Sequence, residues 1–163
     1  MDKLKSKIEN VTHDEIDTSS EMKIFKDLYL YGNLNKDSKP LSGKKMLNMA
    51  KQLGLEDCKI LNIDEYVSAC LKNNEPKNCI IFVPSDKGPI GHWTSSYTQN
   101  NTIYFFNSLG NVKTQSAINR IKRVRNITAN SKVYQNNTPS NCGWLALLHL
   151  VAHAKPAVVQ KEA

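Results

Sequence analysis

Cys142 is the residue of this sequence best suited to nucleophilic chemistry. It stands between a turn-rich segment at 136–141 and an almost uninterrupted apolar segment at 142–154, which predicts a buried helix that begins at the cysteine. Unpaired N–H groups and the helix dipole in a first turn favour an anion, so we expect a lowered thiol pKa at Cys142. The adjacent Gly143 would let a substrate backbone approach closely. A buried structural cysteine is the alternative that this local pattern leaves open.

A thiolate nucleophile needs a general base, and the sequence contains four histidines. His13 lies in a polar N-terminal segment, and two others lie on the predicted C-terminal helix. One of these, His149, is separated from Cys142 by about 10 Å along the helix axis, which is too far for a hydrogen bond. We therefore expect His92, at the start of a predicted strand, to be the base, and His149 to be a packed or surface histidine.

Two amide side chains would complete such a site. A β-hairpin is predicted at 92–110, where two segments rich in β-branched and aromatic residues flank a short polar loop. The hairpin would bring Asn107 near His92, so that its side-chain oxygen accepts from one ring N–H and fixes the tautomer. Gln135 would donate its side-chain N–H beside the backbone N–H of Cys142, and the two would form an oxyanion hole. Asparagine is also common in turns, which is the alternative for Asn107.

Other elements must position these residues, and their patterns predict an α+β fold with a small mixed sheet flanked by helices. The nucleophile would lie at the N-terminus of a buried helix. Besides the hairpin, apolar and β-branched runs predict strands at 79–84 and 131–135. Helical spacing and capping residues predict helices near 20–31, 43–53, 65–73, 115–125 and 142–154.

The whole chain has the length of one ordinary domain, with 163 residues. We expect residues 1–39 to form an N-terminal arm or extension and residues 40–163 to form the domain that carries the site. No apolar run approaches the roughly 18 residues of a membrane helix, and the polar N-terminus does not match a signal peptide. None of the four cysteines lies in a CxxC or zinc-ligand pattern, so we expect neither a disulfide framework nor a metal site.

The order His92-Trp93, Asn107, Gln135, Cys142-Gly143 resembles the adenovirus-type and ubiquitin-like-protein-type clan of cysteine proteases. GHWTSSYTQNNTIYFFNSLG resembles the clan's His-Trp strand and hairpin, and QNNTPSNCGWLALLHL resembles its Gln-x6-Cys-Gly segment. LSGKKMLNMAKQLGL is similar to the first helix of the adenovirus maturation proteases. The resemblance covers about residues 40–154.

The resemblance implies a role for each of the four residues. Cys142 would be the nucleophile, His92 the general base and acid, Asn107 the residue that orients His92, and Gln135 the oxyanion donor. The clan more often has Asp or Glu where this chain has Asn107. A neutral amide orients an imidazole but stabilises its charged form less than a carboxylate does.

The resemblance further implies a cysteine endopeptidase that requires no metal or organic cofactor. The compact basic chain and its first helix favour the viral branch, whose members process capsid and core precursor proteins during virion maturation in double-stranded DNA viruses. A virophage or related virus-like element would fit as well. The substrates would be viral structural precursors, met by a monomeric enzyme in the virion interior or in the host cytoplasm or nucleus. A ubiquitin-like-protein deconjugating protease and an acyltransferase on the same fold are the alternatives.

A net charge of +7 favours association with polyanions, double-stranded DNA first among them. The predicted helix at 115–125 would turn Ile118, Ile121 and Val124 inward. Its outward residues would be Arg120, Lys122, Arg123 and Arg125. The resemblance allows DNA as an activator that binds this basic face, and a solvated surface without a ligand is the alternative.

Overall fold

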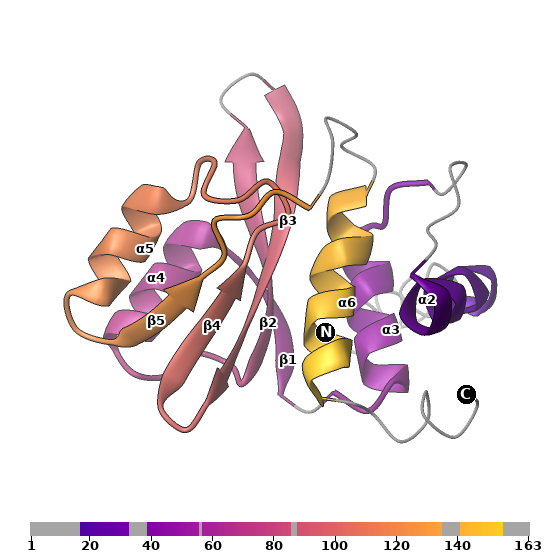
Figure 1. Cartoon of the computed structure of the whole chain (residues 1–163), viewed down its shortest axis with the longest axis horizontal. Coiled ribbons are helices and arrows are strands. Elements are labelled where there is room, and N and C mark those ends of the chain that lie inside the picture. Colours follow the sequence, from indigo (N-terminus) through magenta and orange to yellow (C-terminus); the bar gives the residue numbers. More distant parts are fainter. Residues whose placement is uncertain (1–16, 33–38, 56, 86–87, 135–140, 155–163) are drawn as a thin grey trace, which may run out of the picture.

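The computed structural model describes residues 17–32, 39–55, 57–85, 88–134 and 141–154. Its elements are α2 (Ser19–Tyr31), α3 (Gly43–Gln52), β1 (Cys58–Asn62), α4 (Ile63–Leu71), β2 (Asn78–Ser85), β3 (Gly88–Gln99), β4 (Thr102–Phe106), α5 (Gln115–Lys122), β5 (Asn126–Ala129) and α6 (Cys142–Ala154). One five-stranded sheet runs in the order β1-β2-β3-β4-β5, with helices on both of its faces (Figure 1). Its outer pairs are parallel and its two inner pairs antiparallel, so the predicted α+β fold with a small mixed sheet is confirmed.

The central hairpin of the sheet is formed by β3 and β4. The two strands pair from Ser95 opposite Phe106 to Gln99 opposite Thr102. Asn100 and Asn101 form the turn with φ values of 51° and 65°. Positive φ at both turn residues matches the twist of the flanking strands, and asparagine tolerates that conformation better than most residues. The hairpin predicted at 92–110 is therefore confirmed.

Alternating side chains divide the interior into two apolar layers, one on each face of the sheet. On β2, Ile80 packs toward α2, α3 and α6, whereas Cys79 and Ile81 pack toward α4 and α5. Ile103 and Phe105 on β4 join the second layer. This period of two is what a strand buried between two helical layers requires. Figure 1 shows α4 and α5 on one side of the sheet and α3 and α6 on the other.

Helix α6 is the most apolar element of the first layer. Trp144, Leu147, Leu150 and Val151 are all buried against α2, α3 and the sheet. Their burial confirms the predicted C-terminal helix and fixes its first residue, Cys142, relative to β3. No described helix combines the length and the apolar character that a membrane crossing needs.

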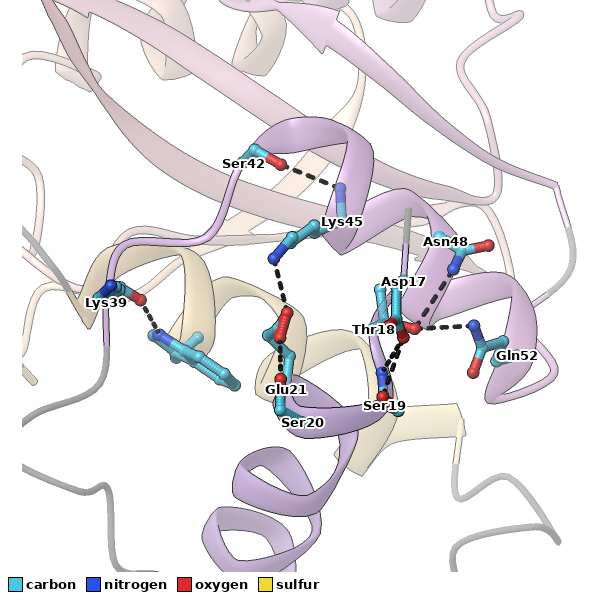
Figure 2. Close-up of polar contacts among 11 residues, drawn as sticks. Asp17, Thr18, Ser19, Ser20, Glu21, Lys39, Ser42, Lys45, Asn48 and Gln52 are labelled. Atoms are coloured by element: carbon cyan, nitrogen blue, oxygen red, sulfur yellow. Dashed lines mark hydrogen bonds and ion pairs between the residues drawn. The ribbon is translucent and has the colours of Figure 1, made fainter. Parts of the chain in front are cut away.

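Helix α2 is fastened to α3 by polar contacts as well as by the core, as Figure 2 shows. Thr18 Oγ1 accepts hydrogen bonds from Asn48 Nδ2 at 3.3 Å and from Gln52 Nε2 at 2.8 Å. Lys45 Nζ lies 2.6 Å from a carboxylate oxygen of Glu21. The side chain of Phe25 is fully buried in the first layer. The division of the chain at residue 39 thus stays a prediction, although α2 shares the core of the segment that follows.

Two predicted elements differ from those observed. The strand expected at 131–135 is absent from the described residues 131–134, which contribute only an isolated bridge between Val133 and Leu109. The edge strand is instead β5, whose single buried side chain, Ile127, gives too weak an apolar pattern to be recognised. The first strand, β1, was likewise not predicted.

The end of α5 also corrects the apolar face predicted for that helix. Helix α5 ends at Lys122, since the N–H groups of Val124 and Arg125 both bond to the Ile121 carbonyl. Val124 therefore lies outside the helix and is 63% exposed, although it was expected to face inward.

Candidate active site

Cys142 is the first residue of α6 and lies against strand β3. Its side chain is buried, and the backbone N–H of Trp93 donates to its Sγ at 3.5 Å. Two residues further along the helix, Trp144 is anchored by its indole N–H, which donates to the Lys39 carbonyl at 2.9 Å. The sulfur atom is thus held at a helix N-terminus by the core packing of α6 and by a strand amide, as expected for the candidate nucleophile.

The electrostatics at Cys142 correct one expectation. Burial raises the pKa of the Cys142 thiol above its ordinary value, and this effect outweighs three backbone N–H groups that act in the opposite direction. Those groups belong to Trp93, Gly143 and Cys142 itself. The expectation of a lowered pKa is therefore wrong, because the helix N-terminus is too well covered. In the free protein the thiol form is favoured, and an external base is needed to remove its proton.

His92 lies on β3 directly before Trp93, whose N–H contacts the cysteine sulfur. Its Nε2 is 2.7 Å from Asn107 Oδ1, which confirms that the hairpin brings these two side chains together. Burial lowers the pKa of His92 below its ordinary value, the bond to Asn107 partly offsets this effect, and the nearby charge of Lys113 adds to the lowering. The imidazole is therefore neutral at neutral pH and available as a base.

The orientation of the Asn107 amide is fixed by two backbone groups with unambiguous roles. The N–H of Leu109 donates to Oδ1 at 2.9 Å, and Nδ2 donates to the Val112 carbonyl at 3.0 Å. A backbone N–H only donates and a carbonyl only accepts, so the oxygen of the amide must face His92. The neutral ring of His92 then carries its proton on Nε2, and Nδ1 keeps the lone pair.

The same amide also explains why an asparagine fits here. Nδ2 makes a second bond, to the buried hydroxyl oxygen of Thr114 at 3.1 Å. Both donors and both lone pairs of the Asn107 amide are thereby used. A carboxylate at this position would turn an oxygen toward the Val112 carbonyl, which cannot donate. The local backbone of residues 109–114 thus favours a neutral amide over a carboxylate at position 107.

Two glycines beside these residues lie in closely packed surroundings, more tightly at Gly91 than at Gly143. A Cβ atom at Gly91 would collide with the Phe82 ring and would lie 2.5 Å from the Val83 carbonyl oxygen. A Cβ atom at Gly143 would lie 3.2 Å from Met46 Sδ and 3.3 Å from Leu41 Cβ. Gly143 therefore lets the start of α6 approach Leu41 and Met46, and its expected role of admitting a substrate backbone stays a prediction.

Among the described residues, the other predicted site residues do not join this group. Gln135, the expected oxyanion donor, lies outside the described residues. Arg120, Lys122 and Arg123 are exposed on or just after α5, which covers the opposite face of the sheet from α6 (Figure 1). His149 is partly buried in the contact between α6 and β3, as expected for a packed histidine. Its Nδ1 lies 3.2 Å from Ser95 Oγ.

Arg125 does not face outward as predicted. Its guanidinium lies 2.6 Å from a carboxylate oxygen of Glu75 and also donates to the Cys70 carbonyl at 2.9 Å. Both side chains of the ion pair are largely buried. Charge and helical spacing gave no indication of this partner, which lies 50 residues away in sequence. Arg125 therefore joins the segment after α5 to the end of α4 and to Glu75, and it is removed from the basic face.

Three residues around Asn107 were not predicted at all. Val112 and Thr114 orient its side chain, and Asn130 binds its backbone, with Asn130 Oδ1 accepting from the Asn107 N–H at 2.8 Å. Their sequence contexts are ordinary turns, so no local signal marks them. Among the described residues, no group of three or more His, Cys, Asp or Glu side chains is arranged to hold a metal ion.

Comparisons with known proteins give a structural likeness at low identity. No family model and no curated protein sequence matches the chain. The ASFV pS273R protease is similar with a TM-score of 0.46 and 13% identity, over 72% of this chain and 58% of that protease. The C-terminal Ulp1 protease domain, solved in complex with SMT3, the yeast ortholog of SUMO, gives a TM-score of 0.43 and 11% identity over 82% of this chain and 71% of that domain.

A third similar structure is AvrA with IP6 and CoA, with a TM-score of 0.46 and 12% identity over 88% of this chain and 62% of that chain. The chain thus spans less than two thirds of the ASFV protease and of AvrA. At such identities none of these structures assigns a role to a residue of this chain.

Proposed function

We propose that this chain is a cysteine endopeptidase in which Cys142 is the nucleophile and His92 the general base and acid. One observation carries the proposal. The N–H of Trp93 contacts Cys142 Sγ at 3.5 Å, and the preceding residue, His92, is bonded to Asn107 at 2.7 Å. Nucleophile, base and orienting residue come from α6, β3 and the end of β4, and their convergence is the pattern that activated nucleophiles require.

The reaction begins from a neutral pair, because burial raises the pKa of Cys142 and lowers that of His92. As the sulfur attacks the peptide carbonyl, its proton passes to Nδ1 of His92, and the carbonyl electron pair moves to the oxygen. Collapse breaks the C–N bond, and His92 returns the proton to the leaving amine. Water then attacks the thioester, giving one proton to His92, and the restored thiol leaves with that proton.

The oxyanion is the charge that develops in each attack, and it needs donors at the helix start. We assign this role to the backbone N–H of Cys142 and to the side chain of Gln135. Removal of one such donor typically reduces turnover by about 10²–10³-fold. Gln135→Ala compared with Gln135→Glu tests the assignment, since only the parent amide can donate a neutral N–H to the oxyanion.

For the substrate we propose viral structural precursor proteins, cleaved within the virion or in the host cytoplasm or nucleus by the monomeric enzyme. The support is the compact, basic chain and the resemblance of residues 41–55 to the first helix of the adenovirus maturation proteases. A deconjugating protease for ubiquitin-like proteins would use the same three residues, so the two functions differ only in the partner. An acyltransferase would transfer an acyl group from a thioester donor in place of hydrolysis.

We also propose double-stranded DNA as an activator that binds the exposed cations Arg120, Lys122 and Arg123. The net charge of +7 supports this. The triple alanine variant should reduce the salt dependence of DNA binding. A matched variant of the exposed residues Lys23, Lys51 and Lys59 should change it less; an equal effect of both triple variants would contradict a localised DNA site.

The experiment that tests the function is cleavage of a Gly-rich peptide library by the wild type and by Cys142→Ala, each with and without DNA. Loss of cleavage in the variant supports the protease, and stimulation by DNA supports the activator. A parallel reaction uses a folded ubiquitin-like protein with a Gly-Gly tail. Cleavage of that substrate alone would replace the viral precursor by the deconjugase alternative, and self-acylation from acyl-CoA without any hydrolysis would favour the acyltransferase.

A further inference from the structure

The backbone of Asn107 is held by a side chain where the sheet itself ends. Strands β4 and β5 pair in parallel up to Phe105 opposite Ala129. The next residue of the second segment, Asn130, then continues the contact with its side chain. Its Oδ1 accepts from the Asn107 N–H at 2.8 Å, and its Nδ2 donates to the Asn107 carbonyl at 2.6 Å. The amide thus offers one acceptor and one donor, as a peptide group of a neighbouring strand would.

Asn130 is itself fixed by its own loop. Its Nδ2 also donates to the Lys132 carbonyl at 2.9 Å, and this bond ties the side chain to the segment after β5. The Asn107 carbonyl accepts a further bond from the Gly110 N–H at 2.9 Å. Backbone and side chain of Asn107 are therefore bonded at every polar atom, and the residue is 1% exposed.

Such a clamp matters because Asn107 stands just beyond the last residue of β4. A residue at a strand end lacks the ladder bonds that fix φ and ψ within the sheet. A small rotation of the Asn107 backbone would swing its Oδ1 away from His92 Nε2, to which it is bonded at 2.7 Å. The bonds from Leu109 and Val112 orient the amide only once the Asn107 backbone is in place.

We propose that Asn130 is a positioning residue of the active site, which acts on His92 through the backbone of Asn107. The proposal rests on the proposed function. Its side chain contacts backbone atoms of Asn107 and Lys132 and donates to neither His92 nor Cys142, so it is not itself catalytic. If Asn130 only joined β4 to β5, its substitution would lower the stability of the fold and nothing else. If Asn130 is a positioning residue, its substitution must also change which ring nitrogen of His92 carries the proton.

The test compares Asn130→Ala with Asn126→Ala, an exposed asparagine four residues earlier on the same segment. The first readout is the tautomer of His92, measured from the ring ¹⁵N chemical shifts. The second is the rate at which iodoacetamide alkylates Cys142, and the third is kcat and KM on a peptide from the Gly-rich library. Asn130→Ser is the second variant, to be used in place of Asn130→Ala if the alanine variant does not fold.

We expect Asn130→Ala to lose the preference for the Nε2–H tautomer and to lower kcat by about 10²-fold with little change in KM, as misplacement of a catalytic group does. The alkylation rate should fall in parallel, and Asn126→Ala should match the wild type in all three readouts. A folded Asn130 variant with the wild-type tautomer and kcat, whatever its melting temperature, would overturn the proposal. If the wild type cleaves no peptide, the proposed function fails, but the tautomer measurement still decides the role of Asn130.

Discussion

Helix α6 meets strand β3 near two partly buried histidines, His92 and His149, that have different surroundings. Beside the first turn of α6, His92 is bonded to the side-chain amide of Asn107. The next residue on β3, Trp93, contacts Cys142 Sγ with its backbone N–H. Two turns later, His149 stacks on Phe106 with ring centroids 4.9 Å apart and lies 5.1 Å from the Tyr97 ring. Burial lowers the pKa of both rings, that of His149 to about 4.

The partners of the two rings explain why only one is suited to catalysis. Ser95 Oγ uses its only proton on the Ala146 carbonyl, at 2.8 Å, so toward His149 Nδ1 it acts as an acceptor. The neutral ring of His149 therefore carries its proton on Nδ1, and its Nε2 keeps the lone pair in a ring that packs against Tyr97 and Phe106. His92 keeps its lone pair on Nδ1, and it lies on β3, the strand that contacts Cys142 Sγ. Burial lowers the pKa of both histidines, so what distinguishes them is what surrounds the nitrogen that carries the lone pair.

The largest expected effect separates the two histidines by substitution. His92→Ala should reduce kcat by about 10²–10⁴-fold, the range that a general acid–base contributes. His149→Phe keeps a ring in the aromatic contact and leaves Ser95 its bond to Ala146, so its kcat should stay close to the wild-type value. Peptide cleavage under saturating substrate measures both. Equal losses in the two variants would mean that His92 has no special role.

The next effect concerns the strand that carries His92. Gly91→Ala forces a Cβ atom into the Phe82 ring and toward the Val83 carbonyl, so β3 must shift beside the base. We expect a loss in kcat of about 10²-fold, since small misplacements of reacting groups have effects of that size. In Gly143→Ala the new Cβ atom would meet the flexible Met46 side chain at 3.2 Å, so the loss in kcat should be smaller. Kinetics of both folded variants provide the measurement, and a fully active Gly91→Ala enzyme would contradict the packing account.

The third effect is on stability and belongs to His149. Its pKa in the folded state is about 4, below the ordinary value of 6.5, so the unfolded chain binds the proton more readily. The free energy of unfolding should therefore fall as the pH drops from 6.5 to about 4, by on the order of 3 kcal/mol. Urea unfolding across this range should show a weaker pH dependence in His149→Phe than in the wild type. Identical slopes in the two proteins would refute the assignment.

The smallest effect is a shift of the pH–rate profile. A neutral pair of Cys142 and His92 predicts a bell-shaped dependence of kcat/KM on pH. Its acid limb should lie below pH 6.5, because the pKa of His92 is lowered. Its alkaline limb should lie above pH 9.0, because the pKa of Cys142 is raised. Asn107→Asp adds a negative charge that favours the imidazolium, so the acid limb should move to higher pH. The same change should destabilise the fold by about 1–3 kcal/mol, because the new oxygen faces the Val112 carbonyl. An unmoved acid limb in that variant would show that another group controls it.

The sequence was sufficient for the parts of the site that have local signals. Cys142 begins a long apolar helix. His92 and Asn107 lie on either side of a hairpin whose turn is marked by two asparagines, so the meeting of these two side chains followed from strand pairing. Asn130 and Thr114 have no such signal, because their roles depend on where the loops after β4 and β5 return. Arg125 was misjudged for the same reason, since its partner Glu75 comes from a distant loop.

The most direct test of the central claim is the alkylation of the four cysteines by iodoacetamide in the folded protein, followed by mass spectrometry. Cys142 is 4% exposed and Cys58 is 8% exposed, so accessibility alone gives Cys142 no advantage. Burial raises the pKa of Cys58 and of Cys70 to about 11, and that of Cys79 further still. We predict that Cys142 reacts first in the wild type and loses this preference in His92→Ala. Equal reactivity of Cys142 in both proteins, or earlier reaction of Cys58, would contradict an activated nucleophile at the start of α6.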